Sequence, residues 1–387
     1  MSVSDVEMSR KTGADIFCRV IDNFGDAGVC WRLARRLAQG HGWRVRLWID
    51  QPELISRFQP GSQLRKHGSG FEGVEVRAWS EPFPEVSPHA VAIEAFGCDL
   101  PASYSQRISP EQVWINLEYL SAESWVESCH ALPSPQGAGR QKYFFFPGFT
   151  EQTGGLLREP GLLDARDQFQ RNRYERDAFL HGLGVPLTGF ARADTATSTQ
   201  PADQSPLLVS LFCYPHAPVR DLVSALSAAS RPVVLLRAYG TCPALEAGSY
   251  GNLQVVNLPF LSQDDFDRLL WSCDVNFIRG EDSFVRAQWA ARPLCWHIYP
   301  QSEEAHLVKL DAWLQRYSSL EEVHALHAAW NSGSRTTTSF RTLLEAVLRP
   351  GFLEQWRTAA RAWSTQLARQ PDLADKLVGF CRQRLKY

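Results

Sequence analysis

Short apolar stretches alternate with helical stretches along most of this chain, and that alternation restricts the possible folds more than any other feature. Strands separated by helical or irregular segments favour a parallel, Rossmann-like sheet. The series occurs twice, and the pattern is mostly helical beyond residue 303. We therefore expect an α/β fold of two Rossmann-like domains facing across a cleft, with a helical C-terminal tail. The expected strands cover residues 15–21, 44–49, 74–79, 90–96, 112–117 and 143–146, and then 207–212, 232–237, 253–258, 275–278 and 294–297.

The length of the chain indicates the same organisation, because 387 residues are too many for one ordinary hydrophobic core. We place the first domain at residues 1–190, including a charged surface helix at 162–180, and the second at 207–362. Residues 191–206 are small, polar and proline-bearing, a composition that cannot bury a core and predicts a flexible linker. The final segment, 363–387, is expected to form a helix that packs back on the first domain.

Composition argues against several classes of protein. The net charge of −2 provides no bulk attraction to nucleic acid or to an anionic membrane. The N-terminus lacks the apolar core of a signal peptide, and no apolar run reaches the length of a membrane span. The nine cysteines form no CxxC pair and no cysteine–histidine spacing suited to zinc, so no metal site is expected. Free thiols fit a reducing compartment, and we expect a cytoplasmic protein.

The strand–turn–helix at residues 15–37, DIFCRVIDNFGDAGVCWRLARRL, contains the first candidate site. Asp22 and Asp26 lie in its turn, beside Gly25 and Gly28, and ligands bind at the carboxyl ends of strands in open α/β sheets. One interpretation is an acid–base or cation-holding pair. The other is structural: Asp26 caps the helix and Asp22 makes a turn. The turn has no glycine fingerprint, and its two carboxylates disfavour a phosphate ligand.

The corresponding strand-to-helix turn of the second half reads Arg279-Gly280-Glu281-Asp282-Ser283. An arginine, a hydroxyl and the N–H groups of a helix N-terminus together form an anion site. The two acidic residues count against a bare phosphate site, although they can bind sugar hydroxyls. An ordinary helix cap with a charged first turn is the alternative.

Two aromatic segments that also follow strands complete the candidates. Phe212 ends the strand expected at 207–212 and Tyr214 follows it, and Phe260 and Gln263 follow the strand at 253–258. Aromatic rings with an amide nearby can stack on a nucleobase and bind its edge. Such aromatic residues are more often part of a hydrophobic core, so that interpretation also stands.

Four long segments, given at the end of this paragraph, resemble the EarP family, protein-arginine rhamnosyltransferases that modify translation elongation factor P. They are spread over nearly the whole chain and occur in the order found in the family. Blocks of this length are far more specific than a short motif. They are IFCRVIDNFGDAGVCWRLARRL (16–37), WINLEYLSAESWVE (114–127), YFFFPGFTEQTGGLLRE (143–159) and IRGEDSFVRAQW (278–289).

The resemblance implies a GT-B glycosyltransferase that inverts the anomeric centre and needs no metal and no cofactor. Its donor would be dTDP-β-L-rhamnose, bound by the second domain. Its acceptor would be an arginine of elongation factor P, bound by the first domain, and the modification would support translation of polyproline stretches. Partners other than elongation factor P and the donor, such as nucleic acid or a membrane, are not expected.

The resemblance also implies roles for individual residues. The catalytic candidates are Asp22, Asp26 and Glu281, with either aspartate a candidate for the base. Glu281 is a candidate for contacting the rhamnose or for orienting Arg279. The donor-binding candidates are Phe212, Tyr214, Phe260, Gln263, Arg279, Asp282 and Ser283. Candidates on the acceptor side are Asn23, Phe24 and Gly25, and Glu118 and Tyr119, the last two being equally compatible with a structural turn.

The chemistry of the reaction agrees with these positions. Guanidinium is a poor nucleophile because its pKa exceeds about 12 and its lone pairs are delocalised. Carboxylates can hold the group, bias its charge and accept a proton. Two alternatives stay open: a GT-B transferase or epimerase acting on another nucleotide sugar and a non-protein acceptor, and a catalytically silent module that binds elongation factor P or a nucleotide. The paired aspartates favour a cationic acceptor.

Overall fold

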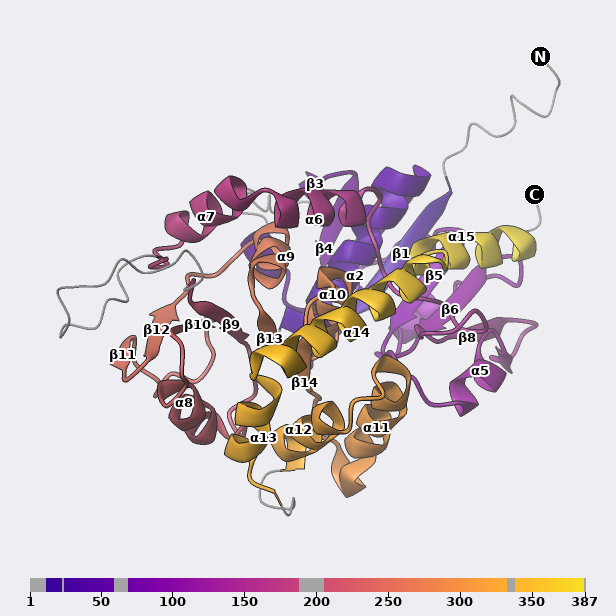
Figure 1. Ribbon diagram of the computed structural model, residues 1–387. Helices are drawn as coiled ribbons and strands as arrows, with labels where there is room; N and C mark the ends of the chain where they lie inside the picture. The colour runs from indigo at the N-terminus through magenta and orange to yellow at the C-terminus, as the bar shows by residue number, and fades with distance from the viewer. Residues whose placement is uncertain (1–11, 23, 59–68, 188–204, 333–337, 386–387) are drawn as a thin grey trace, which may run out of the picture. The chain divides into compact units, whose positions relative to one another are not determined.

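The chain forms two compact units in the computed structural model, which describes residues 12–22, 24–58, 69–187, 205–332 and 338–385 (Figure 1). Unit 1 consists of Met1–Pro160 and Ala368–Tyr387, and unit 2 of Gly161–Leu367. The first boundary is therefore at residue 160, where the sequence analysis placed it at 190. Most of the expected linker, 191–206, lies outside the described residues.

Unit 1 contains an eight-stranded sheet in the order β3-β4-β2-β1-β5-β6-β8-β7. Its central strands are parallel, as expected for a Rossmann-like domain, and the short strands β3 and β7 pair antiparallel at the two edges. The strands are β1 Gly13–Cys18, β2 Arg44–Ile49, β3 Ser69–Phe71, β4 Val74–Ala78, β5 Val91–Ala95, β6 Val113–Leu117, β7 Pro133–Pro135 and β8 Gln141–Phe145; the helices are α2 Phe24–Arg35, α3 Glu53–Phe58, α4 Ala102–Ser105, α5 Trp125–Cys129 and α15 Leu373–Arg384.

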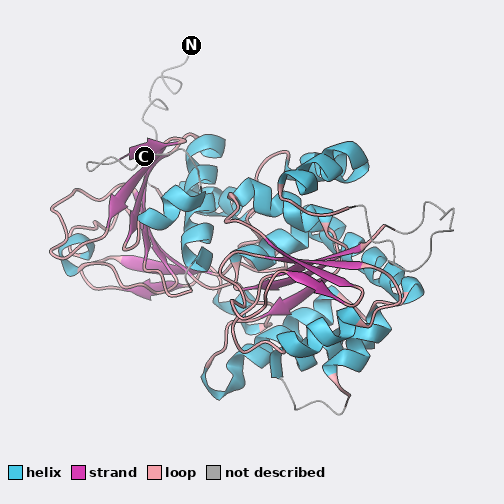
Figure 2. Ribbon diagram, turned by 90° about the vertical axis from the view of Figure 1, so that its left-hand side faces the viewer, coloured by secondary structure: helices cyan, strands magenta, loops and turns pink. Residues whose placement is uncertain are grey.

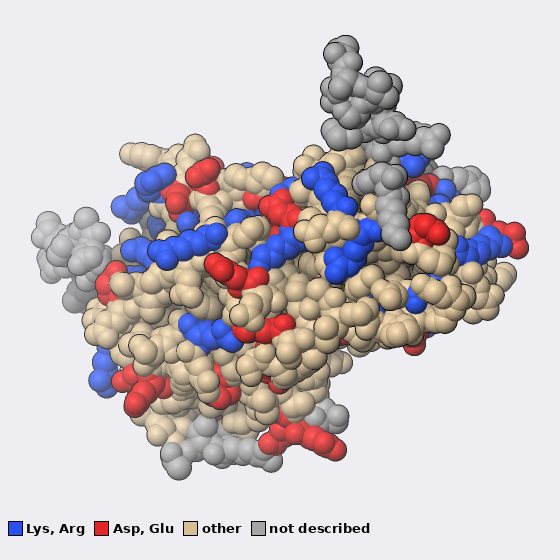
Figure 3. Space-filling model, turned by 90° about the vertical axis from the view of Figure 1, so that its right-hand side faces the viewer, with Lys and Arg blue, Asp and Glu red and all other residues tan. Residues whose placement is uncertain are grey.

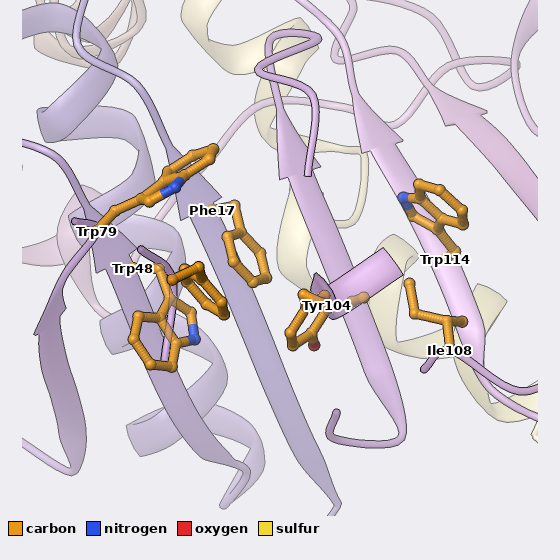
Figure 4. Packing of buried hydrophobic residues seen from close by; sticks show 8 residues of the cluster. Phe17, Trp48, Trp79, Tyr104, Ile108 and Trp114 are labelled. Carbon is orange, nitrogen blue, oxygen red and sulfur yellow. The ribbon is translucent and has the colours of Figure 1, made fainter. Parts of the chain in front are cut away.

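Aromatic side chains fill one face of this sheet. Phe17 of β1 packs between Trp48 of β2 and Tyr104 of α4, with ring centroids 6.1 and 4.6 Å away (Figure 4). Side chains two residues apart on a strand share a face, so Asp15 is buried in the same layer. Its carboxylate accepts hydrogen bonds from Arg46 (2.5 and 2.8 Å) and from the Tyr104 hydroxyl (2.6 Å). This buried charge is therefore paired, and it ties β1 to β2 and α4.

The C-terminal segment contributes to unit 1. The expected single helix at 363–387 is divided, because α14 continues to Ala368 and a new helix, α15, starts after its N-cap Asp372. The Asp372 carboxylate accepts a hydrogen bond of 2.7 Å from Arg36, which directly follows α2, and both side chains are buried. The Phe380 ring lies 5.3 Å from Tyr143 of β8.

Unit 2 contains a six-stranded sheet in the order β11-β12-β10-β9-β13-β14, with helices on both faces (Figure 2). All neighbouring strands are parallel except the edge pair β11–β12. The strands are β9 Leu207–Leu211, β10 Val233–Arg237, β11 Gly248–Tyr250, β12 Leu253–Asn257, β13 Val275–Arg279 and β14 Leu294–His297; the helices are α6 Leu162–Arg171, α7 Arg173–Gly182, α8 Val219–Ser227, α9 Gln263–Ser272, α10 Asp282–Ala290, α11 Ala305–Tyr317, α12 Glu321–Ser332, α13 Phe340–Val347 and α14 Pro350–Ala368.

The segment expected to be one surface helix of the first domain, 162–180, forms two helices of unit 2. Helices α6 and α7 lie beside α9 (Figure 1). The Phe169 ring is 5.8 Å from the Trp271 ring of α9, and the Leu180 side chain belongs to a buried cluster with residues of β9 and β10. Apolar contacts made across the sequence therefore assign this segment to the second unit.

The strand order places a topological switch point in each sheet. In unit 1 the chain goes from β1 to β2 on one side and later to β5 on the other. In unit 2, β9 is followed by β10 on one side and later by β13 on the other. Ligands of open α/β sheets bind outside the carboxyl ends of the strands at such points. The two candidate turns, after β1 and after β13, both lie at a switch point.

Charges of both signs lie on the face that Figure 3 draws. Figure 3 shows Lys and Arg side chains interspersed with Asp and Glu over the face that it draws, in line with the net charge of −2. Among the residues that the structure describes, every helix is too short or too polar to span a lipid bilayer.

Candidate active site

The turn after β1 is organised by Asp26. Its Oδ2 atom accepts hydrogen bonds from the main-chain N–H groups of Ile21 (2.8 Å) and Asp22 (2.9 Å). The strand ends at Cys18, earlier than the expected residue 21, and α2 begins at Phe24, so Asp26 lies in the first helical turn. Its side chain therefore reaches back and shapes the preceding loop. Both the structural and the functional interpretation of this residue remain compatible with that geometry.

Gly25 lies directly against Asp22. Its main-chain N–H donates to the Asp22 carbonyl oxygen at 2.7 Å. A Cβ atom at this position would lie 3.0 Å from the Asp22 Oδ2 atom. A larger residue would therefore displace the Asp22 carboxylate, which explains a glycine inside the turn.

The two carboxyl groups differ in their surroundings. Asp26 is only 3% exposed, and burial raises the pKa of its carboxyl group above the ordinary value. The nearby charges of Asp22 and Asp50 also raise this pKa, whereas the hydrogen bonds from the two main-chain N–H groups lower it. Asp22 is half-buried. Sequence reasoning missed Asp50, which follows β2 directly; an acidic residue at the carboxyl end of a central strand was the available signal. The turn is thus an acidic site with one shielded and one more accessible carboxylate.

The ends of β5 and β6 lie at the same edge of the sheet. The Asn116 side chain accepts from the Gly97 N–H at 3.2 Å and donates to Glu118 Oε1 at 2.6 Å. The Tyr119 ring stacks on Phe96 with centroids 4.4 Å apart. Phe96, which the sequence analysis did not single out, adopts a φ of 58°, a region that bulky residues seldom occupy. Glu118 and Tyr119 are therefore held in place at the same edge of the sheet as the acidic turn, two strands away.

The other acceptor-side candidates are less fully described. Phe24 begins α2, and its ring contacts Phe58 of α3 with centroids 6.1 Å apart. Asn23 lies outside the described residues.

In unit 2, Arg279 at the end of β13 is surrounded by the segment that follows β9. Its guanidinium lies over the ring of Phe212 at 4.4 Å and over the ring of Tyr214 at 4.8 Å. Its Nη1 atom also donates to the carbonyl oxygen of Cys213 at 3.3 Å. Cation–π contacts hold a guanidinium in place without neutralising its charge. The three donor-side candidates Phe212, Tyr214 and Arg279 thus form one cationic, aromatic cluster.

The turn between β13 and α10 is closed by hydrogen bonds. Gly280 has a φ of 65°, and its carbonyl oxygen accepts from the Trp296 indole N–H at 2.9 Å. The Ser283 hydroxyl donates to the Arg279 carbonyl oxygen. Glu281 is the N-cap of α10, and Asp282 is its first residue. Arg279 is therefore fixed beside the N-terminus of a nine-residue helix, an arrangement that favours an anionic ligand.

His297 is a further residue of this site that sequence reasoning did not assign to it. The main-chain N–H of Tyr214 donates to His297 Nδ1 at 3.2 Å. Burial lowers the pKa of this histidine to about 3, helped by His216 and Arg279. The ring is neutral, and it accepts through Nδ1, so its proton is on Nε2. His297 therefore positions Tyr214 and adds no charge.

The remaining donor-side candidates lie at the same edge of the sheet, after β12. The order β12-β10-β9 places them two strands from Phe212. Phe260 contacts the Tyr239 ring with centroids 5.9 Å apart. Gln263 is the first residue of α9, whose N-cap Ser262 accepts from the Asp265 N–H at 3.1 Å, and Gln263 is 5% exposed.

The described residues contain no group of three or more His, Cys, Asp or Glu side chains arranged to hold a metal ion. The arrangement provides two chemically distinct sites, an acidic turn in unit 1 and a cationic aromatic turn in unit 2. The first suits a cation with a proton to give up, and the second suits an anion attached to a ring that can stack.

Comparison with known proteins shows the family to which the chain belongs. A family model described as elongation-factor P (EF-P) rhamnosyltransferase EarP matches residues 14–382. The chain is 44% identical to a protein-arginine rhamnosyltransferase of Pseudomonas aeruginosa, covering 95% of this chain and 98% of that protein. It is 35% identical to a protein of the same name from Neisseria meningitidis, over 96% of this chain and 97% of that one.

Solved structures show the fold. One that describes EarP-mediated arginine glycosylation of translation elongation factor EF-P is 34% identical, with a TM-score of 0.64, and covers 96% of this chain and 99% of its own. The glycosyltransferase TcCGT1 in complex with UDP shares 8% identity at a TM-score of 0.53, a likeness of fold alone. The GT-B fold expected from the sequence is thereby confirmed.

Proposed function

Since the chain belongs to the EarP family and is a protein-arginine rhamnosyltransferase, we propose that it transfers L-rhamnose from dTDP-β-L-rhamnose to an arginine of elongation factor P. The transfer inverts the anomeric centre and uses no metal. The modified factor would then support translation of polyproline stretches. The observation that carries the proposal is the contrast between the acidic turn at the switch point of unit 1 and the cationic aromatic turn at that of unit 2.

The acidic turn suits an arginine acceptor. A guanidinium presents several N–H donors in a planar fork and pairs well with carboxylates. It must also lose a proton as the new C–N bond forms, and this requires a nearby base. Asp22 and Asp26 supply two carboxylates in one turn. The same turn would repel a phosphate, so the donor's diphosphate is assigned to unit 2.

We propose that Asp26 is the base and that Asp22 binds the guanidinium of the acceptor. Asp26 is oriented by two main-chain donors on Oδ2, which leaves Oδ1 as the oxygen for an incoming proton. Burial raises the pKa of its carboxyl group, which increases its affinity for the proton it would accept. Asp22 is the more exposed of the two and is better placed to meet the acceptor first.

The cluster around Arg279 suits the leaving group. When the glycosidic bond breaks, negative charge develops on the departing nucleoside diphosphate. Arg279 and the N–H groups at the start of α10 supply positive charge for it, so a metal ion is not required. Phe260 and Gln263 are assigned to thymine, through stacking and hydrogen bonding. Glu281 and Asp282, beside Arg279, are assigned to the sugar end of the donor.

Transfer to elongation factor P can be tested directly by mass spectrometry. Incubation of the protein with elongation factor P and dTDP-β-L-rhamnose is expected to add the mass of one deoxyhexose to a single arginine-containing peptide. A matched reaction with the Asp26→Asn variant should leave the acceptor unmodified. If elongation factor P stays unmodified while another acceptor or nucleotide sugar is consumed, the alternative of a GT-B enzyme with a non-protein acceptor is the correct one.

A further inference from the structure

Two cysteines of unit 2 lie in contact beside the Arg279 cluster. The Sγ atoms of Cys213 and Cys242 are 3.3 Å apart. Cys213 follows β9, and Cys242 lies in the segment after β10. Because β9 and β10 are parallel neighbours, with Leu211 opposite Arg237, both segments leave the sheet at the same edge. The contact thus joins two loops that are 29 residues apart in the chain.

In this pair one thiol is accessible to solvent and the other is not. Cys98 and Cys129 are the other partly exposed thiols that the structure describes. Cys242 is partly exposed, whereas Cys213 is 1% exposed. The thiols of Cys18, Cys30, Cys273, Cys295 and Cys381 are all buried. A solvent-reachable thiol with a second thiol behind it is the arrangement found in redox-active pairs, in which one sulfur reacts first and the other resolves the product.

The surroundings make Cys242 the more reactive sulfur. The contact with the Cys213 thiol, together with the positive charges of Arg237 and Arg279, lowers the pKa of Cys242. The same contact, with burial, raises the pKa of Cys213. The thiolate is the nucleophilic form of cysteine.

The backbone holds Cys242 in place. Its φ is 44°, a conformation that residues other than glycine seldom adopt. Arg237 stabilises it, because its Nη1 atom donates to the carbonyl oxygens of Thr241 (2.6 Å) and Cys242 (2.8 Å). The sulfur is therefore presented to Cys213 by a fixed loop.

We propose that Cys213 and Cys242 form a reversible disulfide when the protein is exposed to a peroxide. This cross-link weakens nucleotide binding at the Arg279 site. In the first step the Cys242 thiolate attacks the peroxide O–O bond, giving a sulfenic acid and releasing hydroxide. In the second step the Cys213 sulfur attacks the Cys242 sulfur and displaces water. The two thiols lose two electrons and two protons, and one hydrogen peroxide becomes two waters.

The coupling to nucleotide binding follows from what Cys213 touches; this part rests on the proposed donor site. Its carbonyl oxygen accepts from Arg279, and its neighbours Phe212 and Tyr214 flank the guanidinium. A disulfide shortens the 3.3 Å separation of the sulfurs to about 2.05 Å. Protein interiors are close-packed, so a shift of this size moves the segment that carries both rings.

The cross-link itself is tested by peptide mapping. The reduced protein is treated with hydrogen peroxide, free thiols are alkylated, and peptides are analysed without reduction. We expect a peptide pair linked through Cys213 and Cys242 that dithiothreitol removes. The Cys242→Ser variant should lose it, and Cys129→Ser, which alters a partly exposed thiol of unit 1, should keep it. Oxidation that stops at a sulfinic acid on Cys242, or that links other cysteines instead, would overturn the proposal.

The effect on the site is tested by calorimetric titration with dTDP of the reduced, oxidised and re-reduced full-length protein. We expect the oxidised form to bind dTDP at least about tenfold more weakly, with recovery after reduction. Cys242→Ser should bind dTDP as the reduced protein does, before and after peroxide. If the disulfide forms and the affinity does not change, the regulatory part is wrong and the donor site stands. If the reduced protein does not bind dTDP, the donor site is wrong and the disulfide stands on its own result.

Discussion

The Asp26 carboxylate accepts the main-chain N–H of Asp22 at 2.9 Å, so one aspartate of the acidic turn holds the backbone of the other. The two aspartates therefore have different roles in the turn. Asp26 is buried and oriented, whereas Asp22 is half-buried and belongs to the loop that Asp26 shapes. Variants of the two residues should therefore fail in different ways.

Asp26→Asn should remove the base and keep the loop, because an amide oxygen can still accept both main-chain N–H groups. We expect the rate of transfer to fall by about 100-fold or more, with the circular dichroism spectrum and dTDP binding unchanged. Single-turnover transfer to elongation factor P measures the loss. A variant that retains near-normal turnover would show that Asp26 is not the base.

The same substitution should show a characteristic pH dependence of stability. The pKa of Asp26 is raised in the folded protein, so its contribution to stability is present below the unfolded pKa and is lost as the pH rises through the folded pKa. At neutral pH the ionised group is destabilising. Asp26→Asn should therefore unfold at the same or a slightly higher temperature than the parent at pH 7, with the advantage disappearing near pH 4. Thermal unfolding of Asp26→Asn and of the parent, measured across that pH range, tests the direction of this difference in unfolding temperature.

Asp22→Asn should weaken binding of the acceptor more than it lowers the rate of transfer. Loss of a charged hydrogen-bond partner corresponds to a KM for elongation factor P raised by about tenfold or more. Asp50→Asn is the matched control, because Asp50 is a neighbouring acidic residue whose Oδ1 accepts the Val20 N–H at 3.1 Å, a bond that asparagine can keep. Equal effects in steady-state kinetics of both variants would argue that only the overall negative charge of the turn matters.

Arg279→Ala should reduce the affinity for dTDP by about 10- to 150-fold, since it removes the charged donor next to α10. Arg268→Ala, in which an exposed arginine paired with Asp265 is removed, provides the control and should bind normally. Isothermal titration of both variants makes the comparison. An unchanged affinity in Arg279→Ala would contradict the diphosphate assignment.

Chelation should leave transfer unaffected. If Arg279 and the N-terminus of α10 neutralise the leaving group, activity in excess EDTA equals that in buffer alone. The assay uses purified protein, dTDP-β-L-rhamnose and elongation factor P. Activity that is lost in EDTA and restored by a divalent cation would show that the reaction needs a metal.

The buried charge at Asp15 should dominate the stability of unit 1. Burial alone would raise the pKa of this carboxyl group, but the hydrogen bonds from Arg46 and Tyr104 outweigh it and lower the pKa. The stabilisation is therefore present above the unfolded pKa and lost as the pH falls through the folded one. Asp15→Asn should lower the free energy of unfolding by about 3 kcal/mol or more at pH 7, as measured by denaturant titration. Glu75→Gln, which removes one partner of an exposed ion pair, should lower it by about 1 kcal/mol or less.

Much of the fold was predictable because its signals are local. Apolar stretches at positions such as 44–49 form strands by their own residue types, and β2 has the expected bounds. The parallel, two-part arrangement followed from the alternation of strands and helices. The short antiparallel edge strands β3, β7 and β11 were missed, since three residues carry no measurable periodicity. Asp50, Phe96 and His297 were missed for a different reason, because their place beside the candidate sites depends on which strands become neighbours, although the position of Asp50 at the end of a strand was an available signal.

The sequence by itself determined where the chain turns from strand to helix, at Asp22–Asp26 and at Arg279–Ser283, because alternation and capping signals act over a few residues. Only the tertiary structure decided which strands became neighbours. It placed β5 beside β1 and β13 beside β9, and thereby formed the switch points at which both turns lie. It also brought Cys213 to Cys242 and Arg36 to Asp372. Such contacts join residues far apart in the chain, and their energy depends on burial and geometry that no local pattern encodes.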